Sequence, residues 1–406
     1  MGYVDFKRAF HNPAVDERAL YAERFNAPEA VHLDVQVSGN PAFFLMTQDV
    51  YEAALRVSES DKELLRCMRD LPAKAIEQFA VKNLVNEIVI TNEIEGVNST
   101  RREVHEVLDS LAKNDRRKRF HGLVNKYYML TGNDGTPFRT PADIRAAYDE
   151  LVLEEIMADD KKRAPDGDLF RKDSVGVYSP TQKLIHEGLM PEAAISDVLA
   201  KSLDFLNDGA CIPLARIAAF HFMFGYIHPF YDGNGRTNRY ISSYYLANHY
   251  EPIMGYGLSY TIKKRLDEYY KGFTSCEGKL GMGDLTPFVI MFSDIVAEAA
   301  ERIVSLLSEG RDNLFKYESA AARISDVADS KNLSGITSIL IQATLFSDYG
   351  VTMSGLAETM QTSKQTPYRH LKVLEGMGLV EKKKIGKEVF HTVNLERLLE
   401  LSNAQH

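Results

Sequence analysis

The chain has 406 residues and a formal net charge of −9, and its hydrophobic and charged fractions are 45% and 26%. This length suffices for two or three domains, and the composition is ordinary for a globular protein. The negative charge argues against a protein that binds nucleic acid over its whole surface, but it leaves room for a local basic patch.

Three scattered cysteines fit neither a disulfide framework nor a zinc site, so we expect a protein of the reducing cytoplasm. The most apolar segment, residues 212–230, contains Arg216 and His221. We therefore expect a buried helix there and no membrane span. The sequence contains neither GxxxxGK(S/T) nor HExxH, which excludes P-loop NTPases and zincins.

Apolar residues recur at helical spacing after Pro72, and this pattern predicts a helix that runs into residues 91–96, TNEIEG. Thr100 and Glu103 form a capping box, which predicts a second helix over residues 102–113. The first 60 residues have mixed patterning, so we expect only that they pack on the helices that follow.

A third helix is predicted from Thr140 and Pro141, a residue pair that is typical of helix starts. Residues 169–180, LFRKDSVGVYSP, place Val175 and Val177 among small or polar neighbours, which predicts a β-hairpin in a helical region.

Further helices are predicted from Pro191 to Asp208, from Pro213 to the residue before His228, and from Thr286 to about residue 325.

The segment after the apolar helix, residues 228–239, reads HPFYDGNGRTNR. A histidine can exchange a proton near neutral pH, and the carboxylate of Asp232 is a hard oxygen ligand suited to Mg²⁺. Asn234 stands between two glycines, Gly233 and Gly235, which allow a tight turn with free backbone N–H groups that suit an anion.

A helix is predicted to follow over residues 236–249. Arg236 and Arg239 lie on one face of its first turns, where both guanidinium groups can hold phosphate oxygens. Two cations at a helix N-terminus oppose the helix dipole, so this arrangement favours a bound anion. The segment therefore predicts a phosphate site with His228 as the base and Asp232 as the metal ligand.

The segment matches all eight defined positions of HxFx(D/E)GNGRxxR, and the chain thereby resembles the Fic-domain proteins. The resemblance implies a mainly helical fold that transfers part of a nucleotide, usually AMP from ATP with Mg²⁺, onto a protein hydroxyl. TNEIEG also fits (S/T)xxxE(G/N), the inhibitory motif of this family, formed here by Thr91, Glu95 and Gly96. The family pattern implies that Glu95 pairs with Arg239, in the place of the ATP γ-phosphate.

Two further segments resemble parts of Fic proteins. The predicted hairpin with Val175 and Val177 resembles the flap that holds a target segment as an added strand. Tyr269 and Tyr270 match residues that line the adenine pocket in relatives, and a purine can stack on such rings. Alternatively, the hairpin is an ordinary surface hairpin and the tyrosines belong to the core.

The C-terminal part changes in character, with three predicted helices over residues 336–347, 352–361 and 363–376 and two strands around Gly386. This pattern predicts a winged helix-turn-helix, which resembles that of bacterial regulators. Between Thr362 and Asn394 seven Lys or Arg stand against three Glu, a balance that suits phosphate contacts. DNA and a protein partner both stay open.

We thus interpret the chain as a mainly α protein with an N-terminal helical region (1–135), a Fic catalytic core with a β-hairpin flap (136–325) and a winged helix (330–406). The expected reaction is AMP transfer to a Ser, Thr or Tyr of a target protein or of the chain itself, inhibited by Glu95. A hydrolase that removes AMP, a nucleotide-sensing regulator of transcription, other nucleotide donors and a homodimer remain as alternatives.

Overall fold

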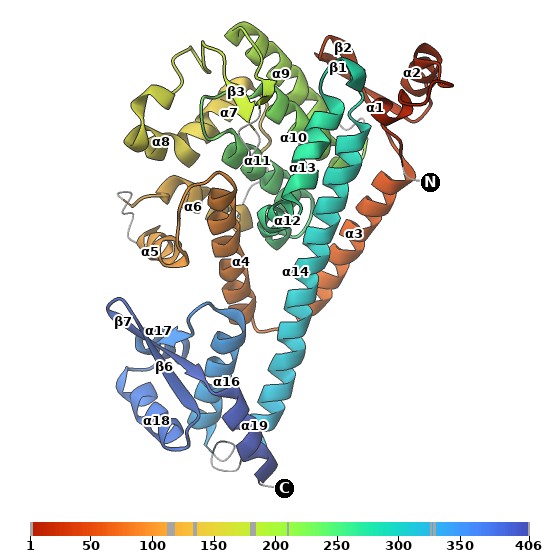
Figure 1. Ribbon diagram of the computed structural model, residues 1–406. Helices are drawn as coiled ribbons and strands as arrows, with labels where there is room; N and C mark the ends of the chain where they lie inside the picture. Colours follow the sequence, from red (N-terminus) through yellow and green to blue (C-terminus); the bar gives the residue numbers. More distant parts are fainter. Residues whose placement is uncertain are drawn as a thin grey trace. The chain divides into compact units, whose positions relative to one another are not determined.

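The computed structural model describes residues 3–111, 118–132, 136–178, 184–208, 211–324, 327 and 330–404. The mainly helical fold predicted from the sequence is confirmed (Figure 1). The chain forms two compact units, residues 1–61 with 84–303 and residues 62–83 with 304–406. The division into three domains predicted above stays a prediction.

The N-terminal part of the chain contains two short helices, a two-stranded sheet and then longer helices. Their bounds are α1 Phe6–Ala9, α2 Glu17–Phe25, β1 Ala30–Val37, β2 Asn40–Leu45, α3 Gln48–Arg69, α4 Ala73–Ile94, α5 Arg101–Leu111, α6 His121–Tyr128 and η1 Met129–Gly132. The predicted capping box is present, because Thr100 N donates to Glu103 Oε2 at 2.8 Å and Glu103 N donates to Thr100 Oγ1 at 3.2 Å. These bonds satisfy two backbone donors at the start of α5.

The middle of the chain runs through α7 Pro141–Tyr148, the π-helical turn η2 Asp149–Leu153, α8 Glu154–Asp159, η3 Lys161–Arg163, β3 Gly176–Tyr178, β4 Leu184–Glu187 and α9 Glu192–Asp208. The helix predicted from Thr140 and Pro141 is confirmed, and a capping box of Thr140 with Asp143 starts it. A hairpin is also present, but its second strand lies beyond residues 169–180, over which it was predicted.

The centre of the first unit is formed by α10 Pro213–Ile227 and α11 Asn234–His249. Nearly every residue of α10 is buried, which agrees with its apolar sequence. The charged Arg216 donates a hydrogen bond from Nη1 to the Leu206 carbonyl. Because α11 is also buried but largely polar, its side chains are positioned by internal hydrogen bonds, such as Asn238 Nδ2 to the His221 carbonyl at 2.8 Å.

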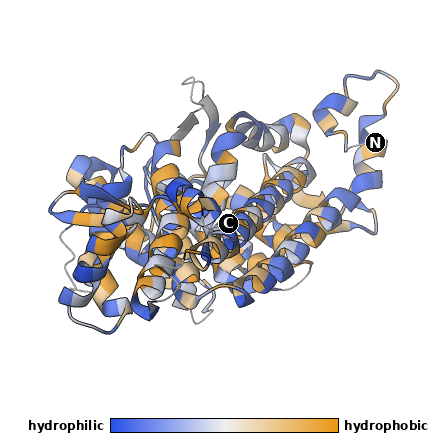
Figure 2. Cartoon of the chain, turned by 90° about the horizontal axis from the view of Figure 1, so that it is seen from below, coloured by the Kyte–Doolittle hydropathy of each residue, from blue (hydrophilic) through white to orange (hydrophobic). Residues whose placement is uncertain are grey.

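The chain continues with η4 Pro252–Tyr256, α12 Leu258–Lys264, α13 Leu266–Cys276, η5 Lys279–Gly281 and α14 Thr286–Ala321. The segment before α14 pairs with the N-terminal sheet, since Phe43 N donates to the Gly283 carbonyl and Leu285 N donates to the Phe43 carbonyl. Most helices carry hydrophilic and hydrophobic residues on different faces (Figure 2). Among the described residues, no helix is long and apolar enough to cross a membrane.

The second unit ends in α16 Lys331–Phe346, β5 Val351–Thr352, α17 Met353–Thr359, α18 Gln365–Gly376, β6 Val380–Ile385, β7 Glu388–Val393 and α19 Leu395–Ala404. Its antiparallel sheet has the order β5-β7-β6. The three predicted helices and both strands around Gly386 are present, whereas the identity of this part as a winged helix stays a prediction.

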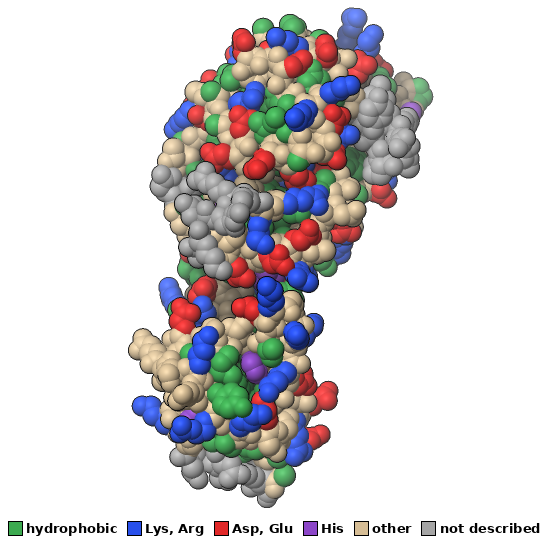
Figure 3. Space-filling model, turned by 90° about the vertical axis from the view of Figure 1, so that its left-hand side faces the viewer, with side chains coloured by type: hydrophobic (Ala, Val, Ile, Leu, Met, Phe, Trp, Pro, Cys, Tyr) green, Lys and Arg blue, Asp and Glu red, His purple; other side chains and the backbone are tan. Residues whose placement is uncertain are grey.

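Figure 3 shows Lys and Arg side chains around hydrophobic ones on this C-terminal part. One hollow is lined by Lys364, directly before α18, and by Tyr368, Arg369 and Lys372 within this helix, and the ring of Tyr368 is exposed. This surface suits phosphate groups, and its partner, DNA or protein, stays a prediction.

Candidate functional site

The backbone that carries His228 leaves helix α10 abruptly. His228 has φ 50° and ψ 63°, a left-handed conformation that is uncommon outside glycine, and Pro229 follows it. Its N–H still donates to the Phe224 carbonyl at 2.9 Å, and the buried Arg171 donates to its carbonyl at 2.8 Å. These contacts fix the backbone that carries the imidazole at the end of α10.

The imidazole of His228 is arranged as a neutral base. Its Nδ1 lies 3.3 Å from the Gly225 carbonyl, which can only accept, so Nδ1 carries the proton and Nε2 keeps a free lone pair. The ring is partly open to a cavity and otherwise enclosed by protein. Burial lowers the pKa of His228 to about 4, against a weaker opposing effect of the Gly225 carbonyl.

The loop between His228 and α11 is held by Asn234. Its Oδ1 accepts from Phe230 N at 3.0 Å, and its Nδ2 donates to the Phe230 carbonyl at 2.7 Å. Gly233 has φ +78°, and a Cβ there would come within 2.9 Å of Val152 and Ile156. Because the first helical bond of α11 is from Thr237 N to the Gly233 carbonyl, the N–H groups before it are available to an anion.

An ion pair joins the end of α4 to α11. Arg239 donates from Nη2 to Glu95 Oε1 at 2.7 Å, and from Nε to Thr91 Oγ1 at 2.7 Å. Gly96, with φ +71°, ends α4 directly after Glu95, while Val97 N donates to the Asn92 carbonyl. The contact that the family pattern implies between Glu95 and Arg239 is therefore present.

Glu95 also covers the start of α11. A Cβ built on Gly235 would lie 2.0 Å from Glu95 Oε1, so the carboxylate rests directly against this glycine. Arg239 is almost fully buried, whereas 28% of the Glu95 side chain is exposed. A carboxylate from outside the signature segment thus occupies the position at which an anion would meet both the helix start and Arg239.

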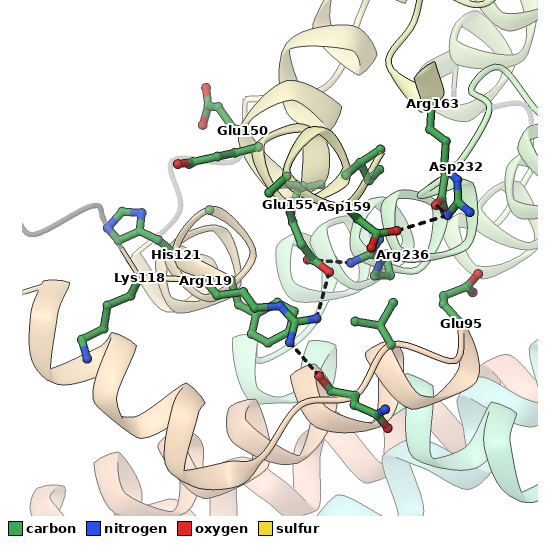
Figure 4. Close-up of a pocket in the computed structure, with 18 of the residues that line it drawn as sticks. Glu95, Lys118, Arg119, His121, Glu150, Glu155, Asp159, Arg163, Asp232 and Arg236 are labelled. Carbon is green, nitrogen blue, oxygen red and sulfur yellow. Dashed lines mark hydrogen bonds and ion pairs between the residues drawn. The ribbon is translucent and has the colours of Figure 1, made fainter. Parts of the chain in front are cut away.

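Two cavities meet at Glu95. The smaller cavity, of about 220 Å³, is lined by His228, Arg239, Tyr269 and Tyr270. The larger cavity, of about 750 Å³, is lined by Asp232, Arg236 and further charged side chains (Figure 4). Glu95 lines both. The smaller cavity, with the two tyrosines, therefore contains the base, and the larger cavity contains the expected metal ligand Asp232.

The two tyrosines of α13 differ in their environment. Tyr269 is 5% exposed and its hydroxyl lies 2.7 Å from His221 Nε2, so it belongs partly to the core. Burial raises the pKa of both Tyr269 and Tyr270, which keeps both phenols neutral. Both rings nevertheless line the smaller cavity, where a base could contact them.

The two signature residues that line the larger cavity, Arg236 and Asp232, already have charged partners. Arg236, which is 1% exposed, donates from Nη1 to Glu155 Oε2 at 2.8 Å, and its Nε has no partner among the described residues. Asp232 accepts from Gly233 N at 2.6 Å and from Arg163 Nη1 at 3.0 Å. Figure 4 shows both pairs among the residues that line the cavity.

The predicted flap lies close to the base. Gly176 of β3 lines the smaller cavity, and Gly188, just after β4, donates from N to the Val175 carbonyl at 3.0 Å. Val177 is paired with His186 in the hairpin, although its side chain lies outside the described part of the chain. The start of this hairpin therefore lies at the smaller cavity, as the predicted flap would.

Four residues near the site were not predicted from the sequence: Glu155, Arg163, Arg171 and Glu277. The first three contact a residue of the signature segment. Glu155 and Arg163 lie on elements with no motif of their own, and Arg171 lies in the segment predicted as the flap, where no role was assigned to it. Burial raises the pKa of Glu277, which lines the smaller cavity, to about 8. No local pattern could have identified them, because their partners are distant in sequence.

Residues 138–246 match the model of the Fic/DOC family. Proteins of this family typically transfer nucleotide-derived groups to proteins. The matched range contains α10, the signature segment and most of α11, which together build the site described above.

The chain is also similar to solved structures. A Fic family protein from Desulfovibrio desulfuricans matches with a TM-score of 0.51 and 19% identity, over 89% of this chain and 98% of that chain. Fic-1 from C. elegans matches with a TM-score of 0.43 and 18% identity, over 64% and 74%. A Fic domain containing signaling protein from Bacteroides thetaiotaomicron gives 0.42 and 13%, over 65% and 97%. The first of these similarities shows that the fold is shared.

Proposed function

We propose that the chain transfers AMP from ATP to a hydroxyl group of a target protein or of the chain itself, and that Glu95 inhibits this transfer. The single observation that carries the proposal is the position of the Glu95 carboxylate, which rests on Gly235 and pairs with Arg239. The Glu95 carboxylate thus marks a place at the start of a helix, beside the neutral imidazole of His228, that suits an anion.

The residues present fit a nucleotide polyphosphate with Mg²⁺. The buried Nε of Arg236 lacks a partner among the described residues, which suits a phosphate oxygen. Gly235 permits a close approach of an anionic group to the helix start, because its missing Cβ leaves the space that the Glu95 carboxylate fills. Asp232 would hold Mg²⁺ through a carboxylate oxygen, as is usual when phosphates supply further ligands. When bound, the metal would neutralise phosphate charge.

His228 supplies the base for the transfer. Its Nε2 takes the proton of the target hydroxyl, while the hydroxyl oxygen forms a bond to the α-phosphorus of ATP. The bond from the α-phosphorus to the bridging oxygen breaks, and pyrophosphate leaves. Base catalysis contributes about 10² to 10⁴-fold, and the helix start together with Arg236 and Arg239 stabilises the charge on the phosphates.

Labelled nucleotides test this function directly. We expect the full chain with Glu95→Gly to incorporate label from α-labelled ATP into protein and to release pyrophosphate, whereas γ-labelled ATP leaves no label on protein. Intact mass should rise by one 5′-phosphoadenosyl group per site. Incorporation from the γ-position would indicate phosphate transfer and contradict the proposal, and incorporation from UTP or GTP alone would reassign the donor.

The low pKa of His228 predicts that the rate of transfer hardly changes with pH in the neutral and mildly acidic range. Because burial lowers this pKa to about 4, the base is neutral throughout the range from pH 5.5 to 7, in which Glu277, whose pKa burial raises to about 8, also stays mostly protonated. The kcat/KM for ATP, which reports the free enzyme, should therefore change by less than about twofold over this range in the Glu95→Gly chain. An ordinary histidine with a pKa of about 6.5 would give roughly a tenfold fall toward pH 5.5. Such a fall would contradict the enclosed environment of His228.

A further inference from the structure

Asp232, the expected metal ligand, is already paired with the guanidinium group of Arg163. Its Oδ1 accepts from Gly233 N at 2.6 Å, and its Oδ2 accepts from Arg163 Nη1 at 3.0 Å. Arg163 belongs to η3, far from the signature segment in sequence. In Figure 4 the Arg163 side chain reaches down to Asp232 at the edge of the larger cavity.

Arg163 is held only weakly by other groups. Its Nη1 lies 3.6 Å from Asp159 Oδ2 and its Nε lies 3.8 Å from Asp160 Oδ2, both longer than a hydrogen bond. Half of the Arg163 side chain and about a third of the Asp232 side chain are exposed. A pair of this exposure is worth little and can exchange its partner. Asp232 can therefore release Arg163 without a large rearrangement.

A guanidinium and a metal ion compete for the same carboxylate. Mg²⁺ binds through a lone pair of a carboxylate oxygen, and Arg163 occupies Oδ2 while Gly233 N occupies Oδ1. The positive charge of Arg163 also repels a divalent cation a few ångströms away. A single partly exposed carboxylate that is already paired with a guanidinium group is thus a poor metal site by itself.

We propose that Arg163 occupies the place of the metal ion on Asp232 while the nucleotide is absent, and so keeps the free chain from binding a divalent cation there. The inference rests on the proposed function, because it takes Asp232 as a metal ligand. Polyphosphate in the larger cavity attracts the guanidinium away from Asp232, and the carboxylate is then open to the metal that accompanies the nucleotide. Arg163 is a positioning residue that couples metal binding to nucleotide binding.

The neighbouring pair supports this coupling. Glu155 lies in α8, a few residues before Arg163, and it holds Arg236 at 2.8 Å. Arg119 also approaches Glu155, at 3.5 Å, and donates to the Asn98 carbonyl at 3.1 Å. One segment, residues 154–163, therefore contributes the counter-charges of both Asp232 and Arg236. Phosphate entering the cavity meets the two pairs together.

Mn²⁺ without nucleotide is the probe for the test, and its free concentration is measured by electron paramagnetic resonance with the full chain. We expect Arg163→Gln to tighten Mn²⁺ binding about fivefold over the unchanged chain, which corresponds to the loss of a half-exposed pair. Arg163→Lys, which keeps the charge, should give much less tightening. The matched control is Lys162→Gln, which removes a charge from the same turn but has no bond to Asp232 among the described residues, and it should leave Mn²⁺ affinity unchanged.

The gained site must depend on Asp232. Adding Asp232→Asn to Arg163→Gln should return Mn²⁺ binding to the level of the unchanged chain. Equal affinity in the unchanged and Arg163→Gln chains, or a gain that survives Asp232→Asn, would overturn the proposal. The melting temperature should stay within a few degrees in all variants, since the pair is exposed. Because the Mn²⁺ experiment contains no nucleotide, its result does not depend on whether the chain transfers AMP in the labelled-nucleotide experiment. A failure of one experiment can therefore be distinguished from a failure of the other.

Discussion

Glu95→Gly is expected to raise AMP transfer by about a hundredfold. In the structure Glu95 Oε1 lies 2.7 Å from Arg239 Nη2 and rests against Gly235, so the nucleotide phosphates and this carboxylate cannot occupy the site together. Arg239 is nearly fully buried while Glu95 is partly exposed, so the pair lies between a surface and a buried ion pair. Its removal is worth about 3 kcal/mol, which corresponds to roughly a hundredfold.

The measurement is the initial rate of label incorporation from α-labelled ATP, with the chain itself and with lysate proteins as acceptors. Glu93→Gly is the matched control, because it introduces the same flexible residue two positions earlier while Glu93 pairs with Lys263 and not with Arg239. It should leave the rate unchanged. If Glu95→Gly gives no gain, and Arg239→Ala in that background changes nothing further, the inhibitory role of Glu95 is wrong.

The same variant separates transfer from removal of AMP. If the chain is a hydrolase, Glu95 orients the attacking water, and Glu95→Gly should abolish the release of AMP from a modified target. If it is a transferase inhibited by Glu95, the variant should accumulate modified protein. Mass spectrometry of one target before and after incubation distinguishes the two outcomes, since the mass changes have opposite signs.

The elements of the site that are local in sequence could be predicted, and those that depend on tertiary contacts could not. Thr100 with Glu103 and Thr140 with Asp143 start helices through bonds three residues apart, so the sequence contains the whole cause. The helix predicted over residues 236–249 begins at Asn234, inside the signature segment, because the left-handed conformation of Gly233 already starts it. Such boundaries depend on backbone dihedrals that residue types only bias.

The partners of the charged residues show the limit of a sequence pattern. Glu95 and Arg239 are 144 residues apart and were paired only through resemblance to a family. Glu155 and Arg163 have no such resemblance, and their carboxylate and guanidinium groups look like ordinary surface charges in the sequence. The same holds for Arg171, whose hydrogen bond to the His228 carbonyl arises only when the hairpin segment folds over α10.

His228→Ala is expected to lower AMP transfer by about 10² to 10⁴-fold in the Glu95→Gly background, while ATP affinity changes by less than about threefold. The imidazole removes the proton of the incoming hydroxyl, and no phosphate-binding group is lost with it. ATP affinity is measured by calorimetry, and transfer by label incorporation. Since kcat should fall without a matching rise in KM for ATP, the two measurements separate a base from a binding residue.

His228 also has a backbone role, and the choice of variant must account for it. At φ 50° a residue such as Ala is strained by about 1 kcal/mol, whereas Asn tolerates the left-handed region better. His228→Asn therefore keeps the turn and removes only the base. We expect both variants to lose transfer to the same extent, with Asn nearer to the unchanged chain in melting temperature. Transfer retained by His228→Asn at a rate comparable to that of His228 would show that the imidazole is not the base, and that the loss in His228→Ala came from a displaced loop.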